Sequence, residues 1–466
     1  MSDAIKELKE KLLSGKKNGY DRMKPEEKAA MHAYCEGYKA YLDAGKTERL
    51  CAVESVRLAE ECGYRPYVRG MEVKSGDKLY VCNRGKAVML AHIGRKSLAE
   101  GAQIVAAHID VPRLDLKPNP LYEESEMAYF KTHYYGGVRK YQWVTVPLEI
   151  RGVVAMKDGS SVIVNIGGDA GDPKVVITDL LPHLGAEQSQ KPLGTAFSGE
   201  ALNLLAGSCP IGDEDDTGRV KLAVMQILNE KYGITEDDFT SAELEAVPAA
   251  NAMDIGLDRS MIGAYGHDDR VCGYAGLKAL LDLETTPEKT AVCILADKEE
   301  IGSNGVTGLQ ASTFDTFMED LCDAQSVPLR VCFEKSFCIS ADTAAAYDPH
   351  YSEVYEKHNA AYMNYGVNIC KYTGARGKAG TSDADAESVA YVRRVFDNAD
   401  VIWQIGELGK VDGGGGATVA AYMANRNIST LDVGVPVLSM HAPLEVASKL
   451  DCYETYKGMK AIYQAD

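Results

Sequence analysis

Long hydrophobic runs and paired cysteines are both missing from this sequence of 466 residues. No apolar run approaches the roughly 18 residues that span a membrane, so we expect no membrane partner. The first seven residues, MSDAIKE, lack the apolar segment of a secretory signal peptide. The 12 cysteines include no Cys-x-x-Cys pair, which argues against a disulfide framework and against a thiolate metal site. These absences predict a cytoplasmic protein.

Positive charge is also scarce. The chain has 50 Lys and Arg residues against 68 Asp and Glu residues, a net charge of -18. An acidic surface repels phosphate backbones, so we expect no nucleic-acid partner. The apolar content of 45% is ordinary for a globular protein. A domain with one hydrophobic core rarely exceeds roughly 250–300 residues, and this chain is longer, so at least two domains are expected.

Apolar spacing divides the chain into two kinds of segment. Helical spacing covers residues 1 to about 65, and strand-like runs alternate with helices up to 118 and again from 251 to 466. In between, short β-like runs are separated by Gly/Asp turns. We therefore expect an α/β fold, a mixed sheet flanked by helices, from residues 1–118 and 251–466. Residues 119–250 are expected to form an inserted, β-rich domain.

Several predicted elements end or begin at polar residues. They are a strand at 332–342 that ends in a carboxylate, a helix at 271–281 capped by Asp268 or Asp269, a helix at 417–424, and a last strand at 433–440 that leads to His441.

The segment 297–303, DKEEIGS, follows the apolar run 291–296. Two adjacent glutamates thus stand at the carboxyl end of a predicted buried strand, where open α/β sheets form ligand crevices. Because side chains alternate along an extended chain, one glutamate can face a metal ion while the other carries a proton. A solvated acidic turn is the alternative, and this segment alone does not decide between the two.

Four further junctions present ligand-type side chains. With the two glutamates the set is His108, Asp268, Glu299, Glu300, Asp342 and His441. Parallel strands would bring such residues to one edge of a sheet, and Asp110 would share a face with His108. Imidazole nitrogens with carboxylate oxygens suit zinc, cobalt or manganese. The set is too large for one tetrahedral ion and suits two ions that share a bridging carboxylate.

Taken in order, these segments resemble a known family. They are HID at 108–110, HDDR at 267–270, DKEEIGS at 297–303, SAD at 340–342 and SMH at 439–441. They resemble the motifs of the aspartyl aminopeptidase and vacuolar aminopeptidase I family of dinuclear zinc metallopeptidases. The segments 371–378 (KYTGARGK) and 407–416 (ELGKVDGGGG) are more similar to the aminopeptidase I branch. The resemblance implies a zinc-exopeptidase-like domain that removes N-terminal residues from peptides.

The resemblance also implies individual roles. His108 and Asp342 would hold one zinc ion, Glu300 and His441 the other, and Asp268 would bridge them, with Co²⁺ or Mn²⁺ able to replace zinc in one site. Glu299 would be the general base, and Asp110 would orient the imidazole of His108. Asp269 stands where many family members have Asn, so whether Asp268 or Asp269 bridges stays open.

An oligomer is implied as well. In this family the inserted domain builds a dimer interface, dimers assemble into a dodecamer, and a histidine that matches His183 reaches a neighbouring subunit's site. We expect no vacuolar-targeting prosegment, because the first helix starts almost at once. Lys371 and Arg376 could bind a substrate carboxylate or pair with nearby acids. The branch favours neutral or hydrophobic N-terminal residues over acidic ones.

Two other functions compete with the aminopeptidase. One is another two-metal amidohydrolase, such as a deacylase of N-acyl amino acids. The other is a non-catalytic assembly that keeps its metals for structure. The presence of Glu299 beside the ligand set disfavours it, because a structural site needs no base.

Overall fold

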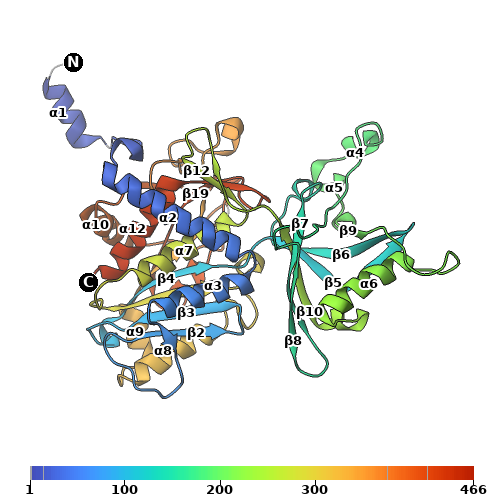
Figure 1. Ribbon diagram of the computed structural model, residues 1–466. Coiled ribbons are helices and arrows are strands. Elements are labelled where there is room, and N and C mark those ends of the chain that lie inside the picture. Colours follow the sequence, from blue (N-terminus) through green and yellow to red (C-terminus); the bar gives the residue numbers. More distant parts are fainter. Residues whose placement is uncertain (1–2, 14, 375, 417) are drawn as a thin grey trace.

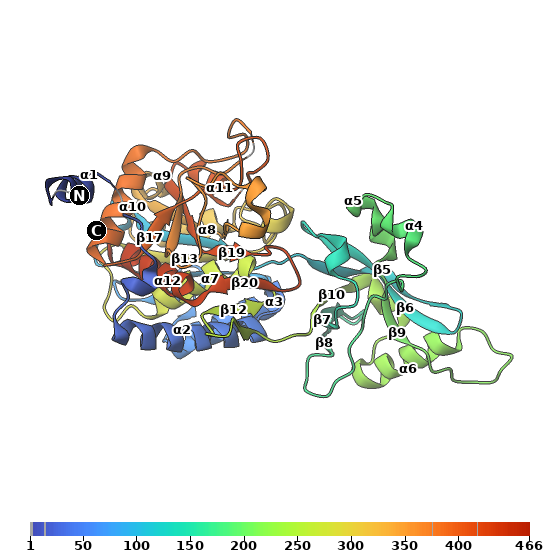
Figure 2. The same cartoon turned by 90° about the horizontal axis from the view of Figure 1, so that it is seen from above.

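The computed structural model describes residues 3–13, 15–374, 376–416 and 418–466. The predictions made for Met1, Ser2 and Ala417 lie outside this part of the chain. Figures 1 and 2 show two lobes joined by a narrow connection, with α1 (Asp3–Leu12) extending from the far side of the larger lobe. Within the described ranges, no helix combines the length and apolar character that crossing a membrane requires.

A nine-stranded mixed sheet forms the centre of the larger lobe, in the order β1-β2-β3-β13-β4-β14-β18-β16-β17. The strands are β1 (Arg65–Pro66), β2 (Lys78–Asn83), β3 (Ala87–His92), β4 (Ala102–His108), β13 (Thr290–Ala296), β14 (Phe337–Ala341), β16 (Val367–Cys370), β17 (Trp403–Ile405) and β18 (Ser429–Gly434). Strands β13, β4, β14 and β18 are parallel neighbours. Their carboxyl ends therefore share one edge of the sheet.

Helices cover both faces of this sheet. One face carries α2 (Pro25–Ala44), α3 (Glu48–Glu61), α7 (His267–Leu281), α10 (Ala386–Asn398) and α12 (Lys449–Gln464), and the other carries α8 (Thr313–Asp323), α9 (Leu329–Lys335) and α11 (Ala420–Ala424). Side chains alternate between the two cores: Val105 of β4 packs into the first core, and its neighbours Ile104 and Ala106 pack into the second. The predicted α/β fold class is confirmed.

A five-stranded sheet, β11-β12-β20-β19-β15, lies in the same lobe. Its strands are β11 (Met253–Ile255), β12 (Met261–Ala264), β15 (Ala344–Ala345), β19 (Pro436–Leu438) and β20 (Glu445–Ser448). The predicted strand at 433–440 is wrong as a single element: β18 ends at Gly434 and β19 begins at Pro436, which has no backbone N–H to donate to a ladder. His441 is therefore reached from this smaller sheet.

The smaller lobe contains a six-stranded sheet, β8-β7-β10-β5-β6-β9. Its elements are β5 (Arg113–Glu124), β6 (Met127–Tyr135), β7 (Leu148–Ala155), β8 (Ser161–Ile166), α4 (Ala186–Ser189), α5 (Leu193–Ala196), β9 (Leu204–Gly207), α6 (Arg219–Tyr232) and β10 (Ala242–Pro248). The sheet has its own hydrophobic core. Its first strand begins at Arg113, so the predicted domain boundary after residue 118 falls inside β5.

Two local predictions near the sheet edge are wrong. The segment 332–342 is not one strand, because α9 continues to Lys335 before β14 starts. Leu329, Cys332 and Phe333 pack into one core at helical spacing, which outweighs the apolar run as a strand signal. Helix α7 begins at His267 with Gly266 as its N-cap, so neither adjacent aspartate caps it.

Candidate metal centre

The carboxyl ends of three parallel strands create the site. His108 is the last residue of β4 and lies opposite Ala296, the last residue of β13. Asp342 directly follows β14 on the other side of β4. A short 3₁₀ turn, η6 (Glu299–Ile301), follows β13, and Lys298 at its start has a left-handed φ of 69°. Backbone strain of this kind is stored mostly at functional sites.

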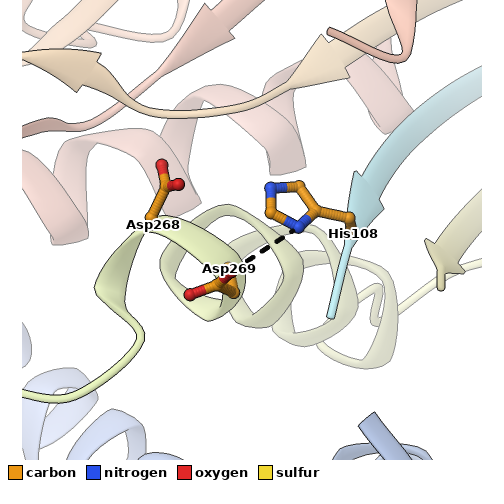
Figure 3. Close-up of side chains that lie close together, drawn as sticks. All are labelled: His108, Asp268 and Asp269. Atoms are coloured by element: carbon orange, nitrogen blue, oxygen red, sulfur yellow. Dashed lines mark ion pairs between the residues drawn. The ribbon is translucent and has the colours of Figure 1, made fainter. Parts of the chain in front are cut away.

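The first turn of α7 supplies two aspartates. Figure 3 shows Asp268 and Asp269 leaving the helix in different directions, with Asp269 Oδ1 3.9 Å from His108 Nδ1. Asp268 belongs to two groups of potential ligand atoms that lie within 4.8 Å of one another: one with His108 and Asp269, the other with Glu300 and His441. Asp268 thus stands between the two histidines.

His441 approaches Asp268 from the five-stranded sheet. Its Nε2 lies 3.0 Å from Asp268 Oδ2 and 3.3 Å from Glu300 Oε1. Its Nδ1 lies 3.0 Å from the carbonyl oxygen of Gly137, to which a protonated Nδ1 donates. The backbone at His441 is left-handed, with φ 65°. This contact directs Nε2 at the carboxylates, the arrangement that metal-ligating histidines commonly have.

His108 faces carboxylates on both sides of its ring. Its Nε2 lies 3.5 Å from Asp342 Oδ1, and its Nδ1 lies 3.5 Å from Asp110 Oδ1. The imidazole is buried, and so is Asp110. Asp110 therefore lies on the side of the ring that faces away from Asp342.

The carboxylate of Asp110 also holds the backbone of the two glutamates. Its Oδ1 accepts from the N–H of Glu299 at 2.9 Å, and its Oδ2 accepts from the N–H of Glu300 at 3.1 Å. The hydroxyl of Tyr135 donates to Oδ2 at 2.8 Å. Burial opposes ionisation of Asp110, but the hydrogen bond and charge of His108 and these donors keep its pKa below the ordinary value. The fixed carboxylate thereby sets the conformation of the turn.

The site concentrates negative charge in a buried place. Burial raises the pKa of Glu299 to about 8, and the charges of Asp342 and Asp110 add to the rise. Burial likewise raises the pKa of Glu300 well above its ordinary value, with the nearby aspartates adding to it. For Asp268, burial is outweighed by the hydrogen bond and charge of His441, which lower the pKa to about 2. A cation between these groups would offset their repulsion.

The donor set fits such a cation. Both carboxylate oxygens of Asp269 and Oε1 of Glu300 are buried without a hydrogen-bond partner in the described part of the chain. Unpaired buried acceptors of this kind cost roughly 1–3 kcal/mol each unless something binds them. Two imidazoles with several carboxylates form a ligand set of the zinc type. The residues are therefore suited to hold zinc.

A cavity of about 440 Å³ opens beside these residues. Its lining includes Asp268, Glu299, Glu300, Asp342 and His441, together with Gly137, Asn368, Glu407, Leu408, Gly415, Gly416, Thr418, Asp432, Val433 and Met440. The volume is in the range of small-molecule sites, and it gives the carboxylates access to a ligand.

Two predicted substrate contacts lie elsewhere in this single chain. Lys371 is exposed and is not among the described residues that line the cavity, although its neighbour Cys370 is. His183 is exposed in the smaller lobe, just before α4, and likewise does not line it.

Three residues of the site were missed from the sequence. Tyr135 and Gly137 come from the end of β6, and Glu445 accepts from the backbone N–H of Asp268 at 3.0 Å and of His441 at 2.5 Å. Two consecutive glycines after a strand could have indicated a close backbone approach. Glu445 carries no such signal, because its role depends on the pairing of β20.

Comparison with known proteins gives a consistent answer. Residues 44–463 match the family described as Aminopeptidase I zinc metalloprotease (M18). A relative from Clostridium acetobutylicum, named Probable M18 family aminopeptidase 1, is 46% identical over 458 residues, covering 97% of this chain and 98% of that protein. The crystal structure of an M18 aminopeptidase from Thermotoga maritima has a TM-score of 0.92 and 43% identity, covering 97% and 99%.

A more distant likeness shows the fold alone. The structure of the S. cerevisiae mApe1 dodecamer has a TM-score of 0.74 at 18% identity, covering 93% of this chain and 98% of that one. Together these matches confirm the resemblance drawn from the sequence motifs and favour the aminopeptidase over the deacylase. The chain belongs to the aminopeptidase I zinc metalloprotease family, M18.

Proposed function

We propose that this protein removes the N-terminal residue of peptides with two zinc ions per chain. His108 and Asp342 would hold one ion, Glu300 and His441 would hold the other, and Asp268 would be shared between them. The observation that carries this proposal is the membership of Asp268 in both groups of ligand atoms. Asp268 lines the cavity, whereas Asp269 is not among its described lining residues, which favours Asp268 as the bridge.

Bound zinc would acidify a water molecule and polarise the scissile carbonyl group. Glu299 accepts a proton from the attacking water as the water oxygen bonds to the carbonyl carbon, and then gives the proton to the nitrogen of the leaving amine as the C–N bond breaks. Burial and the neighbouring carboxylates raise the pKa of Glu299 to about 8 when no cation is bound, and bound zinc would lower it, so that the carboxylate can accept the proton. Asp110 orients His108 and holds the backbone of Glu299.

The substrate is a peptide with a free α-amine and a neutral or hydrophobic first residue. Leu408, Val433 and Met440 supply apolar walls to the cavity, in support of this preference. Lys371 contacts a substrate carboxylate from the rim, next to Cys370. Co²⁺ or Mn²⁺ can replace zinc in one of the two sites, because N/O ligand sets accept several divalent ions.

A panel of aminoacyl p-nitroanilides, each assayed with zinc, cobalt and manganese, tests this function. Free-amine substrates with apolar side chains are expected to be cleaved, and their N-acetylated forms are not. Release of acetate from the N-acetylated forms, with no cleavage of the free-amine forms, would instead favour a deacylase. Failure to cleave any aminoacyl substrate with all three metals would favour a non-catalytic assembly.

Glu299→Gln tests the base. The variant is expected to keep its zinc and to lose roughly 10²- to 10⁴-fold in kcat. Glu407→Gln is the matched control, because Glu407 lines the same cavity but has no proposed proton role. Equal activity of Glu299→Gln and wild type would show that Glu299 is not the general base.

Asp268→Asn and Asp269→Asn test the bridge. Zinc content measured by mass spectrometry should fall for both ions in Asp268→Asn and for at most one ion in Asp269→Asn, because Asp269 belongs only to the group that contains His108. The reverse pattern would make Asp269 the bridging residue.

Residues 119–250 form the dimerisation domain of a homo-oligomer, a dodecamer built from dimers, in which His183 reaches a neighbouring subunit's site. Exposed leucines near α4 and α5 support an interface there: Leu180, Leu181, Leu184 and Leu193. Light scattering measures the assembly. Mixed oligomers of His183→Ala and Glu299→Gln chains should regain activity that neither variant has alone, and no regain would exclude a role of His183 across subunits.

A further inference from the structure

Three consecutive residues, the last residue of β6 in the smaller lobe and the two glycines that follow it, touch the candidate metal centre of the larger lobe. Each touches a different part of it. The hydroxyl of Tyr135 donates to Asp110 Oδ2 at 2.8 Å, and the carbonyl oxygen of Gly137 lies 3.0 Å from Nδ1 of His441. Figure 2 shows β6 in the smaller lobe, on the far side of the connection from α7.

Gly136, between them, packs against Glu300. A Cβ at this position would lie 3.1 Å from Glu300 Oε2 and 3.3 Å from Glu300 Cβ. The backbone there has a φ of 71°, which side chains rarely adopt. Both the space and the conformation therefore require glycine beside the carboxylate.

Tyr135 is itself held in place at the junction of the lobes. The guanidinium of Arg113 lies 3.8 Å from the centre of the Tyr135 ring. Arg113 also pairs with Glu48 of α3, in the larger lobe, and with Glu245 of β10, in the smaller lobe, each at 3.4 Å. All four side chains are buried. A buried arginine stacked on an aromatic ring and shared by two carboxylates is a rigid connection.

We propose that residues 135–137 are a positioning segment through which the smaller lobe sets the geometry of the metal ligands and of the base. Tyr135 acts through Asp110, whose carboxylate holds the N–H groups of Glu299 and Glu300. Gly136 confines the side chain of Glu300, and Gly137 fixes the ring of His441. The proposal rests on the proposed function, since it assigns these three contacts to groups that bind zinc or carry the proton.

Tyr135→Phe removes the hydroxyl and keeps the ring beneath Arg113. Removal of a hydrogen bond from the outer layer of a metal site typically lowers affinity or activity roughly 10- to 100-fold. We expect a loss of this size in zinc affinity, measured by competition with a chelator, and in kcat, with KM unchanged. Tyr134→Phe is the matched control, because its half-exposed ring neighbours Tyr135 and its hydroxyl makes no hydrogen bond within the described residues.

Gly136→Ala tests the contact with Glu300 independently. Gly218→Ala in the same lobe is its control, because Gly218 has the same φ of 71° but nothing within 4 Å of an added Cβ. Gly136→Ala should lower zinc content, whereas Gly218→Ala should introduce only the backbone strain.

Wild-type zinc affinity and kcat in Tyr135→Phe, or equal losses in each variant and its control, would overturn the proposal. These zinc measurements do not depend on Glu299 acting as the base, so an active Glu299→Gln would refute the mechanism and leave this test intact.

Discussion

Replacing Asp110 by asparagine keeps the shape of the side chain but should weaken the hydrogen bonds that hold the η6 turn, Glu299–Ile301. The carboxylate uses both oxygens: Oδ1 accepts from Glu299 N–H, and Oδ2 accepts from Glu300 N–H and from Tyr135. Asparagine has one acceptor oxygen. Whichever way its amide turns, the NH₂ group faces one of the two backbone N–H groups, and that donor loses its partner.

The cost follows from these contacts. An unsatisfied buried donor costs roughly 1–3 kcal/mol, and the remaining bond loses the added strength of a charged acceptor. Asp110→Asn should therefore destabilise the folded chain by about 2–4 kcal/mol. Asp110 Oδ1 lies 3.5 Å from His108 Nδ1 and is proposed to orient that ring, so kcat and zinc affinity should each fall roughly 10- to 100-fold.

Three measurements check this expectation: the unfolding midpoint in urea, the zinc dissociation constant, and kcat on an aminoacyl p-nitroanilide. Asp158→Asn is the control, because Asp158 accepts from the backbone N–H and the hydroxyl of Ser160 through a single oxygen at an exposed turn. An asparagine can replace it there. Full stability and full activity in Asp110→Asn would refute the reasoning, since they would mean that the carboxylate does not hold the turn.

Two further predictions concern metal removal and packing. Burial first, and neighbouring carboxylates second, raise the pKa of Glu299 to about 8 from 4.5 and of Asp269 to about 7 from 3.8. The folded state therefore binds more protons than the unfolded chain between about pH 4 and pH 8, so stability falls as pH rises through this window. The melting temperature of chelator-treated protein should drop across this pH window. Excess zinc should remove the drop, because the charge of a bound cation favours the deprotonated form of the carboxyl groups around it. A flat profile without metal would contradict this. Gly434→Ala would place its Cβ 1.5 Å from the carbonyl oxygen of Asp342, so it should cost about 1–3 kcal/mol in denaturant unfolding and lower the zinc content. Gly194→Ala has nothing within 4 Å and should change neither.

The sequence predicts the sheet edge well, for a physical reason. Strands β4, β13 and β14 are buried along their whole length, so each is a mostly apolar run that ends at a polar residue or just before one. Parallel pairing then follows from the alternation of strands and helices. The proximity of His108, Asp342 and the turn at Glu299 could be expected on that basis.

The position of His441 in the fold could not be predicted in the same way. It depends on β19 and β20 pairing in a second sheet, whose short strands leave little periodicity to read. The contribution of Tyr135 was hidden for a different reason. It requires a strand of the inserted lobe to end against the other lobe, and no local pattern encodes that contact.

The potential ligands of the candidate metal centre are drawn from residues as far apart in the sequence as His108 and His441. During synthesis the ribosome releases His441 long after His108, so a growing chain carries an incomplete set of ligands until its final helix is being made. An enzyme that trims the N-termini of other chains is thereby kept inert while it is itself unfinished. For the same reason, a chain cut before His441 should be inactive rather than an unregulated peptidase.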